Sequence, residues 1–557
     1  MLGGCIFSLY MLIFAYTAVF WKEVAMTLNT KVKVPLPDKG VIVRSGGKRY
    51  VYKVLETFRN DKNQPTNKNR LIGRLDPESG MLIPNNAYYE FYGFTASIEM
   101  VPEQITVKSA GAAFLLSHIL TSLGVSAILD KVLGQSRAMA VITSAIYMAC
   151  RGNVFERVLN WWENSLIYDA PLSSQKASKL FASITYDERM AFFRKWIKQH
   201  EAEGYLVYDV TSFSTHAEGI SDSERGYNRD NDNLPQINLG CYLLEHIGLP
   251  LFYVTYPGSI VDKSHLPYMM AYNDELGIKD LIFVMDRGFC TAPNLTWMHS
   301  EKKHYIVSVD MSHKIPYDAV DQVRSTIVSL RNYIESGVFG EAVHSSFYGV
   351  EARMHVYFSH TLAIRHTRSL QNSIEKLEKE LKALSTLNKK GTRRYERYFN
   401  IYRNEDGTFT FDRNYEKIDM LTANCGFFCL LSNTDLSTSD ILAAYNRRDT
   451  IEKGFDDVKN HLDMKRLRTH KNATTDGKLF CAFIALIAIS ELMQRLKEFL
   501  KVNSMSKHLI ISELEKIKTL ELPDSRRLIN PLTKKQRELL EAFGLGENEV
   551  KAYAAKK

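Results

Sequence analysis

Two patterns of hydrophobic and polar positions follow one another along the first part of the chain. Residues 26–104 alternate apolar and polar positions between turn signals, which predicts a small β-rich N-terminal unit. Residues 105–200 change to a helical period, with long apolar-rich stretches over 110–123 and 138–150. The pattern therefore predicts a β-rich unit followed by a mostly helical region.

From residue 205 onward, short apolar runs predict strands in a different arrangement. Three runs come first and are then followed by alternating helical and strand-like segments, at 205–210, 237–244, 251–256, 266–276, 281–286, 292–303 and 305–309. Such an order predicts an α/β fold, a mixed sheet with helices on its faces. Two of the runs end in a carboxylate, at Asp209 and Asp286.

Residues 310–420 interrupt this pattern with a charged helix among polar, strand-like pieces, and they are interpreted as inserted. A buried strand at 426–431, a long helix at about 439–461 and an apolar helix at 479–493 follow. The predicted organisation is the first half of a core, an insertion, the second half of the core and a basic helical tail, over 201–310, 311–420, 421–500 and 501–557.

The N-terminal segment 1–25 differs from the rest of the chain, because Met1 to Trp21 carry no charge and the first cation is Lys22. A run of this length is just enough for a membrane span of ~20 residues. We interpret it as translated leader from a start codon placed too early, with Met26 as the natural start; a membrane anchor is the less favoured alternative.

Composition narrows the class of protein. The chain has 557 residues, 45% hydrophobic and 24% charged, which excludes collagen-like, disordered and disulfide-scaffold proteins. The seven cysteines are odd in number and scattered, as in proteins of a reducing cytosol. The formal net charge of +8 permits a polyanionic partner without requiring one.

The predicted helix 439–461 carries a polar constellation. Tyr445, Arg448, Glu452 and Lys459 fall within an arc of roughly 60° at about 100° per residue. Taken alone, this arc is more typical of a solvated face with an Arg448–Glu452 pair. Together with Asp209 and Asp286, however, Glu452 completes three acids, which is what two Mg²⁺ ions need for phosphodiester chemistry, provided that the carboxyl groups meet within about one nanometre.

The spacing Tyr445-x2-Arg448-x3-Glu452-x6-Lys459 resembles the Tyr-Arg-Glu-Lys signature of the insertion-sequence-four family of DDE transposases. Further pieces resemble the family in the same order, at Tyr208-Asp209-Val-Thr211, Gly226-Tyr-Asn-Arg-Asp with Leu234-Pro-Gln-Ile, Tyr256-Pro-Gly-Ser-Ile-Val-Asp262 and Met285-Asp286-Arg-Gly-Phe289. The resemblance implies a ribonuclease-H-like core interrupted by a β-rich insertion, and the transposase of a bacterial insertion sequence.

The resemblance also implies roles for the individual residues. Asp209, Asp286 and Glu452 would be catalytic and would bind two Mg²⁺ ions, for which Mn²⁺ can substitute, while Tyr445, Arg448 and Lys459 would contact DNA near the cleaved end. The reaction would be cut-and-paste transposition, and the partners would be element terminal inverted repeats and target DNA, bound by a homodimer. No small-molecule substrate is expected, and the location would be the bacterial cytoplasm, at the nucleoid.

Several residues leave alternatives open. Asp449 and Asp456 rival Glu452 by helical phase, although only Glu452 keeps the family spacing. Turn capping is the favoured role for Asp262 and Asp310, and His216 and His265 are interpreted as polar neighbours, because hard Mg²⁺ prefers oxygen. A catalytically inactive DNA-binding derivative and a structure-specific nuclease are the alternative functions.

Basic residues gather in three clusters outside this constellation. Each could pair with phosphates or simply be a solvated face; they are Lys48, Arg49 and Lys53; Lys389, Lys390, Arg393, Arg394 and Arg397; and Lys465, Arg466, Arg468 and Lys471. We favour the third cluster, and within it Lys465, Arg466 and Arg468, because it continues the helix that bears Glu452. Recognition of the DNA ends is expected in the helical region 105–200.

Overall fold

The computed structural model describes most of the chain, over residues 32–46, 48–60, 62–93, 106–200, 205–227, 233–244, 248–278, 281–387, 389–448, 457–522 and 527–556. The chain divides into two compact units, Met1–Ile105 and Thr106–Lys557. The predictions made for residues 1–25 lie outside the described residues.

The first unit is built on alternating sequence. Four antiparallel strands pair in chain order, followed by one short helix; they are β1 (Val41–Gly46), β2 (Lys48–Arg59), β3 (Pro65–Leu75), β4 (Leu82–Pro84) and α2 (Asn86–Tyr92). Val51, Ile72, Leu82 and Tyr88 form its own small core. The Asn85 side chain accepts a hydrogen bond from the Tyr88 backbone N–H and so caps the first turn of α2.

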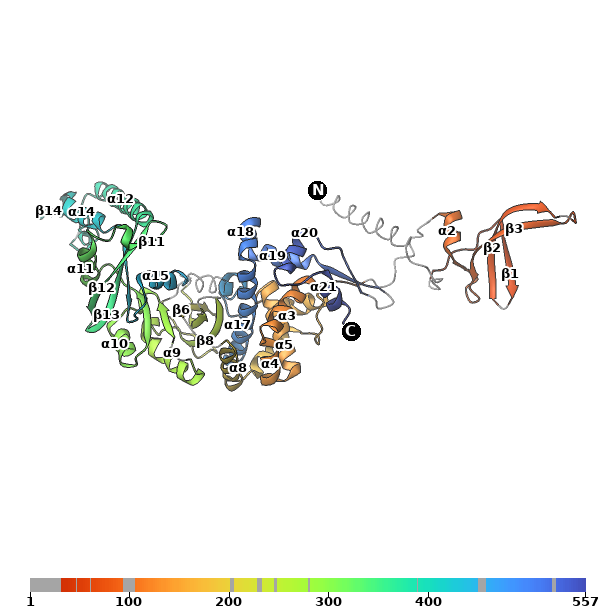
Figure 1. The fold of residues 1–557 in the computed structure, drawn as a ribbon, viewed down its shortest axis with the longest axis horizontal. Coiled ribbons are helices and arrows are strands. Elements are labelled where there is room, and N and C mark those ends of the chain that lie inside the picture. Colours follow the sequence, from red (N-terminus) through yellow and green to blue (C-terminus); the bar gives the residue numbers. More distant parts are fainter. Residues whose placement is uncertain are drawn as a thin grey trace. The chain divides into compact units, whose positions relative to one another are not determined.

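The second unit contains a nine-stranded mixed sheet (Figure 1). Its strands are β6 (Tyr205–Ser214), β7 (Gln236–Leu244), β8 (Leu249–Pro257), β9 (Ile282–Met285), β10 (His304–Ser308), β11 (Tyr333–Glu335), β12 (Val338–Phe347), β13 (Val350–Ser359) and β16 (Phe427–Ser432). They lie in the order β11-β12-β13-β16-β10-β9-β6-β7-β8. The prediction of an α/β fold with a large mixed sheet is confirmed.

The topology of this sheet follows from the length of the connections. β6, β7 and β8 form an antiparallel meander, whereas β9 pairs parallel to β6 and β10 parallel to β9. Parallel neighbours need a crossover, and helices α9 (Asp262–Leu276) and α10 (Ala292–Ser300) supply the helical parts of these connections. β16 then returns antiparallel to β10.

Residues 311–420 contribute to two different cores. Helix α11 (Lys314–Val323) and strands β11 to β13 belong to the main core, because β13 pairs with β16 and so extends the central sheet. A second small core, which includes Ile374, Leu377, Leu381 and Phe399, lies among α12 (His360–Ala383), β14 (Phe399–Arg403), β15 (Phe409–Arg413) and α14 (Tyr415–Ala423).

Helix α17 (Asn472–Arg495) joins the helical region to the sheet (Figure 1). It contacts β8 and three N-terminal helices, which belong to the set α3 (Gly111–Ser122), α4 (Val125–Leu133), α5 (Gln135–Arg151), α6 (Val158–Glu163), α7 (Ser174–Ser183) and α8 (Tyr186–Gln199). Residues 479–489 of α17 are all buried, so the helical region and the sheet share one hydrophobic core.

The two faces of the sheet are covered by different helices. Met269 of α9 lies beside Tyr208 on one face, whereas Phe213 and Cys241 line a small cavity together with residues of α17 on the other. In the part of the chain described, no single helix is long and apolar enough to cross a membrane, and three pairs of helices bent at a short break meet the length and composition criteria only when taken together.

The C-terminal segment folds back onto the helical region. It contains α18 (Lys497–Asn503), α19 (Lys507–Glu515), β17 (Lys518–Glu521), β18 (Arg527–Ile529), α20 (Lys534–Glu541) and α21 (Glu547–Ala554). Strand β17 pairs antiparallel with β5 (Thr106–Ser109), and residues of α19, α20 and α21 join the main core. The segment therefore includes strands and buried helices.

The prediction of one continuous helix over 439–461 is wrong. Helix α15 (Thr438–Asn446) ends at Asn446, and Arg447 and Arg448 form a turn in which the Arg448 N–H donates to the Tyr445 carbonyl over 3.0 Å. A π-helical turn, η5 (Asp457–His461), follows after residues outside the description. Tyr445 and Lys459 therefore do not share one continuous helix.

Gly477 allows α17 to cross α7 at close range, which yields a stability prediction. A Cβ at this position would lie 2.0 Å from the Phe181 carbonyl oxygen, so Gly477→Ala must push the two helices apart. We expect a loss of about 3 kcal/mol in the free energy of unfolding, despite the better helix propensity of alanine. Urea unfolding measures this, with Gly288→Ala as control because its Cβ meets nothing within 4 Å. Equal midpoints for the two variants would contradict the close crossing.

Candidate active site

Asp209 and Asp286 lie level with each other on neighbouring parallel strands. Val207 of β6 pairs with Val284 of β9, and each aspartate stands two residues further along its strand direction. Asp286 directly follows β9 and keeps an extended backbone, with φ −75° and ψ 162°. Because adjacent strands lie ~4.8 Å apart and side chains alternate between faces, both carboxylates project from the same face of the sheet.

Each of these carboxylates is oriented by the backbone that follows it. One Asp209 oxygen accepts a hydrogen bond from the Val210 N–H over 2.8 Å, and one Asp286 oxygen accepts from the Arg287 N–H over 2.7 Å. Both residues are only partly buried. Asp209 alternates with Tyr208 along β6 and therefore lies on the face that α17 covers.

Arg448 reaches Asp209 from the turn after α15. Its guanidinium lies 3.6 Å from an Asp209 carboxylate oxygen, and both side chains are 13% exposed. The same guanidinium lies over the Tyr445 ring, 5.7 Å from its centre. Helix α15 is capped by Ser437 and crosses β9, β10 and β16, which fixes where this turn arrives. The structure thus brings Tyr445, Arg448 and Asp209 together.

Glu452 and its two rivals, Asp449 and Asp456, lie outside the described residues. Among the residues that are described, no group of three or more His, Cys, Asp or Glu side chains could hold a metal ion. Asp209 and Asp286 still fit a hard divalent cation as partial ligands, because they lie level on neighbouring strands and Asp209 already attracts a cationic group. Of the three predicted acids, the structure therefore brings two together.

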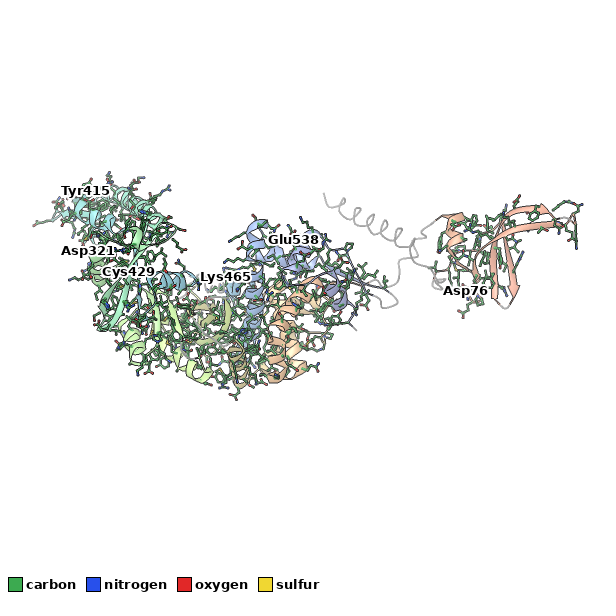
Figure 2. All side chains as sticks on the ribbon, in the orientation of Figure 1. Asp76, Asp321, Tyr415, Cys429, Lys465 and Glu538 are labelled. Carbon is green, nitrogen blue, oxygen red and sulfur yellow. The ribbon has the colours of Figure 1, made fainter. Side chains whose placement is uncertain are left out.

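The predicted DNA-contact cations lie further along β6. Lys459 is half-buried in η5, and Lys465 is exposed in the loop that follows (Figure 2). The Ser214 N–H donates to the Lys465 carbonyl over 3.1 Å, and the Leu467 N–H donates to the Ser214 carbonyl over 3.2 Å. Ser214 stands five residues beyond Asp209, about 17 Å at strand rise, so the loop of Lys465 is bonded to the strand of Asp209 further along its course.

Arg466 and Arg468 complete this loop. Arg466 forms a parallel bridge with Ser214, and Arg468 pairs with Asp463 over 3.3 Å in a largely exposed ion pair. In the insertion, by contrast, Arg394 pairs with Glu380 and lies over the Tyr395 ring. Arg394 thus packs beside the second small core, to which Tyr395 belongs.

The residues interpreted as bystanders have other local partners. Asp262 begins α9 and accepts a hydrogen bond from the Tyr256 hydroxyl over 2.8 Å. Asp310 accepts from the Ser312 N–H over 2.9 Å, a turn contact that lowers the pKa of its carboxyl group. His265 stacks on Tyr256, with ring centres 3.8 Å apart, and burial lowers its pKa. His216 is exposed.

Sequence reasoning missed the residues that anchor α15. His355 of β13 is 1% exposed and shares a hydrogen bond of 3.1 Å with the Thr438 hydroxyl, and the Tyr357 hydroxyl donates to the Thr438 carbonyl over 2.8 Å. Both act through the N-terminus of the helix that carries Tyr445. No sequence motif marks these two residues. The only signal is that they stand two positions apart, and so on one face, of a strand within the predicted insertion.

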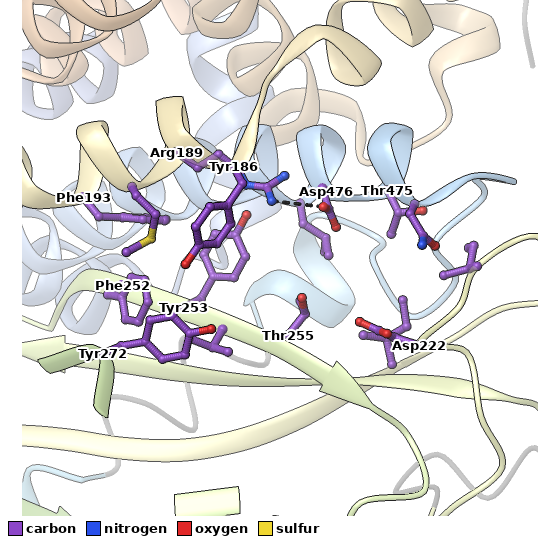
Figure 3. A pocket seen from close by; sticks show the side chains of 16 residues that line it. Tyr186, Arg189, Phe193, Asp222, Phe252, Tyr253, Thr255, Tyr272, Thr475 and Asp476 are labelled. Atoms are coloured by element: carbon purple, nitrogen blue, oxygen red, sulfur yellow. Dashed lines mark hydrogen bonds and ion pairs between the residues drawn. The ribbon is translucent and has the colours of Figure 1, made fainter. Parts of the chain in front are cut away.

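A cavity of about 210 Å³ lies away from these residues, between α8, β8 and the start of α17 (Figure 3). Arg189 and Asp476 form an ion pair of 3.0 Å across it, with Asp222 and Thr255 on the wall beneath. None of the predicted site residues that the structure describes lines it. The side chains that line the cavity include one cation and two carboxylates, so the cavity does not suit a phosphate group.

Comparison with known families identifies the catalytic half of the chain. The family described as Transposase DDE domain matches residues 202–488, just over half of the sequence. The chain belongs to the DDE transposase family. Its matched segment begins three residues before β6 and ends inside α17, so it includes Asp209, Asp286 and the turn with Arg448. The family assignment identifies an enzyme that acts on DNA as a transposase.

Comparisons with individual proteins add little to the family assignment. No curated protein matches this transposase. Among solved structures, it is similar to the piggyBac transposase in a cryo-EM structure of the synaptic complex with hairpin DNA. That similarity has a TM-score of 0.32 and 10% sequence identity, and it covers 73% of this chain and 76% of that chain.

The burial of His355 predicts an acid-sensitive anchor for α15. Burial, with Arg353 nearby, lowers the pKa of His355 from 6.5 to about 4. The unfolded chain therefore binds this proton first, so the free energy of unfolding falls as pH drops from about 6.5 to 4, by about 3 kcal/mol at most. His355→Gln should flatten this dependence in urea titrations at several pH values. His344→Gln is the control, because His344 is exposed on the neighbouring strand; equal slopes in the two variants would refute the anchor.

Proposed function

We propose that this protein is the transposase of a bacterial insertion sequence of the insertion-sequence-four type, which cuts its element from DNA and joins it to a target. The observation that carries the proposal is the level position of Asp209 in β6 and Asp286 directly after the parallel strand β9, inside the segment that matches the transposase DDE domain. The Tyr445-Arg448-Glu452-Lys459 spacing supports the assignment to this family.

The proposed core is ribonuclease-H-like. Strands β8, β7, β6, β9 and β10 lie side by side in that order, with β7 antiparallel and β9 and β10 parallel to β6, which is the arrangement expected of such a core. We propose that residues 311–420 are an insertion into it. The separate small core around Leu377 and Phe399 supports this reading for the part that follows β13.

In the proposed mechanism the acids prepare the scissile phosphate. Asp209, Asp286 and Glu452 would hold two Mg²⁺ or Mn²⁺ ions, and bound ions of this kind activate water and stabilise the oxygens of an in-line phosphodiester displacement. Arg448, which pairs with Asp209 in the DNA-free chain, would exchange that carboxylate for a backbone phosphate by its bidentate fork. Tyr445 would position the guanidinium and contact the DNA backbone beside it.

The proposed DNA path continues from these acids along β6. Lys459, Lys465, Arg466 and Arg468 would bind successive phosphates of the element end, since the loop after η5 is bonded to Ser214, beyond Asp209 on β6. We propose that the helical region 105–200 reads the terminal inverted repeats and that two copies act together on paired ends. The cysteines of the described residues are free thiols, which supports action in the bacterial cytoplasm.

Replacing the acids tests the chemistry. Asp209→Asn, Asp286→Asn and Glu452→Gln should each reduce cleavage of a labelled duplex that carries the element end, with Mg²⁺, on the order of 10³-fold. Binding of the same duplex should remain within a few-fold, because the substitutions preserve shape. Asp310→Asn is the control and should cleave like the unmodified protein, since Asp310 caps a turn.

The outcomes of this assay separate the alternatives. Cleavage followed by joining to a target duplex supports a transposase. Cleavage without joining identifies a structure-specific nuclease, and binding without cleavage in the unmodified protein identifies an inactive derivative. Retained cleavage in Asp286→Asn would remove Asp286 from the metal-binding acids.

Replacing the cations tests the DNA path. Lys465→Ala and Arg468→Ala should each weaken binding of the duplex and lower the slope of log Kd against log salt by about 1, as loss of one phosphate contact does. Fluorescence anisotropy at several salt concentrations gives these slopes. Lys535→Ala is the control, an exposed lysine on α20. A slope unchanged in both loop variants would exclude the loop from the DNA path.

A further inference from the structure

A buried polar pair lies beneath the loop that carries the predicted DNA-contact cations. Lys478 of α17 is 3% exposed and Asn153, just after α5, is 1% exposed. The Lys478 ammonium donates to the Asn153 side-chain oxygen over 3.1 Å, and it also lies over the Phe155 ring. Lysine is almost never fully buried unless it is paired, so this position calls for a specific partner.

The partners of this pair all belong to one short loop. Lys478 donates to the Leu467 carbonyl over 2.9 Å, while the Asn153 side-chain amide donates to the carbonyls of Asp463 and Arg466. Three backbone carbonyls within residues 463–467 are thus satisfied by two side chains from the helical region and α17. Such a buried network fixes geometry because each unmet group would be costly.

The loop needs this support because its backbone is unusual. Asp463 and Arg468 have φ angles of 55° and 51°, in the left-handed region that side chains other than glycine rarely adopt. Gly152 permits the close approach of α5 to this loop, since a Cβ there would lie 3.0 Å from the Asp463 Cβ. On its other side the loop is hydrogen-bonded to Ser214 of β6, on both the N–H and the carbonyl.

We propose that Asn153 and Lys478 are positioning residues that hold the loop 463–468 against β6, so that Lys465, Arg466 and Arg468 face a DNA backbone in line with Asp209. The proposal rests on the proposed function of that loop. In this proposal the buried pair contributes to DNA binding by positioning the loop, in addition to its contribution to the core.

The network does not depend on the charge of Lys478. Burial lowers the pKa of Lys478 to about 7, so both protonation states occur near neutral pH. A neutral amine keeps two N–H donors, as many as the two acceptors that Lys478 contacts. The pair therefore holds the loop in both states, and the test is made on geometry and DNA contact.

The first measurement uses the full chain without DNA. Hydrogen exchange of the Leu467 amide, which donates to Ser214, reports opening of the loop. Lys478→Met should accelerate this exchange about 10- to 100-fold, because it leaves the Leu467 carbonyl and the Asn153 oxygen without a donor. Thr143→Val is the matched control, a buried polar residue of α5 that bonds to Asp169 and does not touch the loop. Unchanged Leu467 exchange in Lys478→Met would overturn the proposal.

The second measurement tests whether Lys478 affects DNA binding by way of the loop cations. Lys478→Met should weaken binding of the element-end duplex and lower its salt slope, whereas in the triple variant Lys465→Ala, Arg466→Ala, Arg468→Ala it should add almost nothing. Equal losses in both backgrounds would show a merely structural role and overturn the proposal. Asn153→Asp removes the donors to Asp463 and Arg466 while keeping an acceptor for Lys478, and it must reproduce both effects if Lys478→Met does not fold.

The two measurements distinguish this proposal from the proposed function. If the unmodified protein and the triple variant bind the duplex equally, the loop is not a DNA contact and the proposed DNA path fails, even where Lys478→Met accelerates exchange. If the triple variant loses binding but Lys478→Met changes neither exchange nor salt slope, the DNA path stands and the positioning role fails.

Discussion

The arrangement of the candidate active site depends on the parallel pairing of β9 with β6. Three residue pairs join these strands, and their register sets Asp209 and Asp286 at the same level. A shift of one residue would turn one carboxylate to the opposite face, into the layer that contains Tyr208 and Met269. Because both faces of the sheet are buried, such a shift would expose apolar side chains and bury polar ones, and this cost specifies the register.

The segments that surround Asp209 and Asp286 are supported by the same sheet. Helix α15 packs on β9, β10 and β16 and so positions Arg448 beside Asp209. The loop after η5 is hydrogen-bonded to the end of β6, which positions its cations. Asp209 lies within β6 and Asp286 directly after β9, while the cations of residues 465–468 lie in a loop held by buried partners. This division is typical of enzymes whose rigid elements fix the reacting geometry and whose loops bind the substrate.

The sequence predicted the order of strands and helices well between residues 205 and 309, because apolar runs bounded by turns are a local signal. It also placed Asp209 and Asp286 at the ends of two apolar runs, which holds for Asp286 after β9, whereas β6 continues to Ser214 beyond Asp209. The prediction of the helix that carries Tyr445 was wrong at Asn446, where α15 ends. No glycine or proline marks a break at Arg447 and Arg448, and the turn there is stabilised by Asp209, which is distant in sequence. His355, Asn153 and Lys478 could not be predicted either, since their roles arise only from contacts between residues far apart in sequence. The third acid, Glu452, stays a prediction.

The pairing of β17 with β5 has a consequence for synthesis of the chain. Residues 106–109 begin the second unit, yet the strand that completes their sheet, Lys518–Glu521, is synthesised only after the whole catalytic segment. Until then the edge of β5 and the apolar side of α3 facing Leu514 and Ile517 lack their cover. A polypeptide that ends before residue 518 therefore leaves this side of the helical region uncovered, although its catalytic segment is already complete.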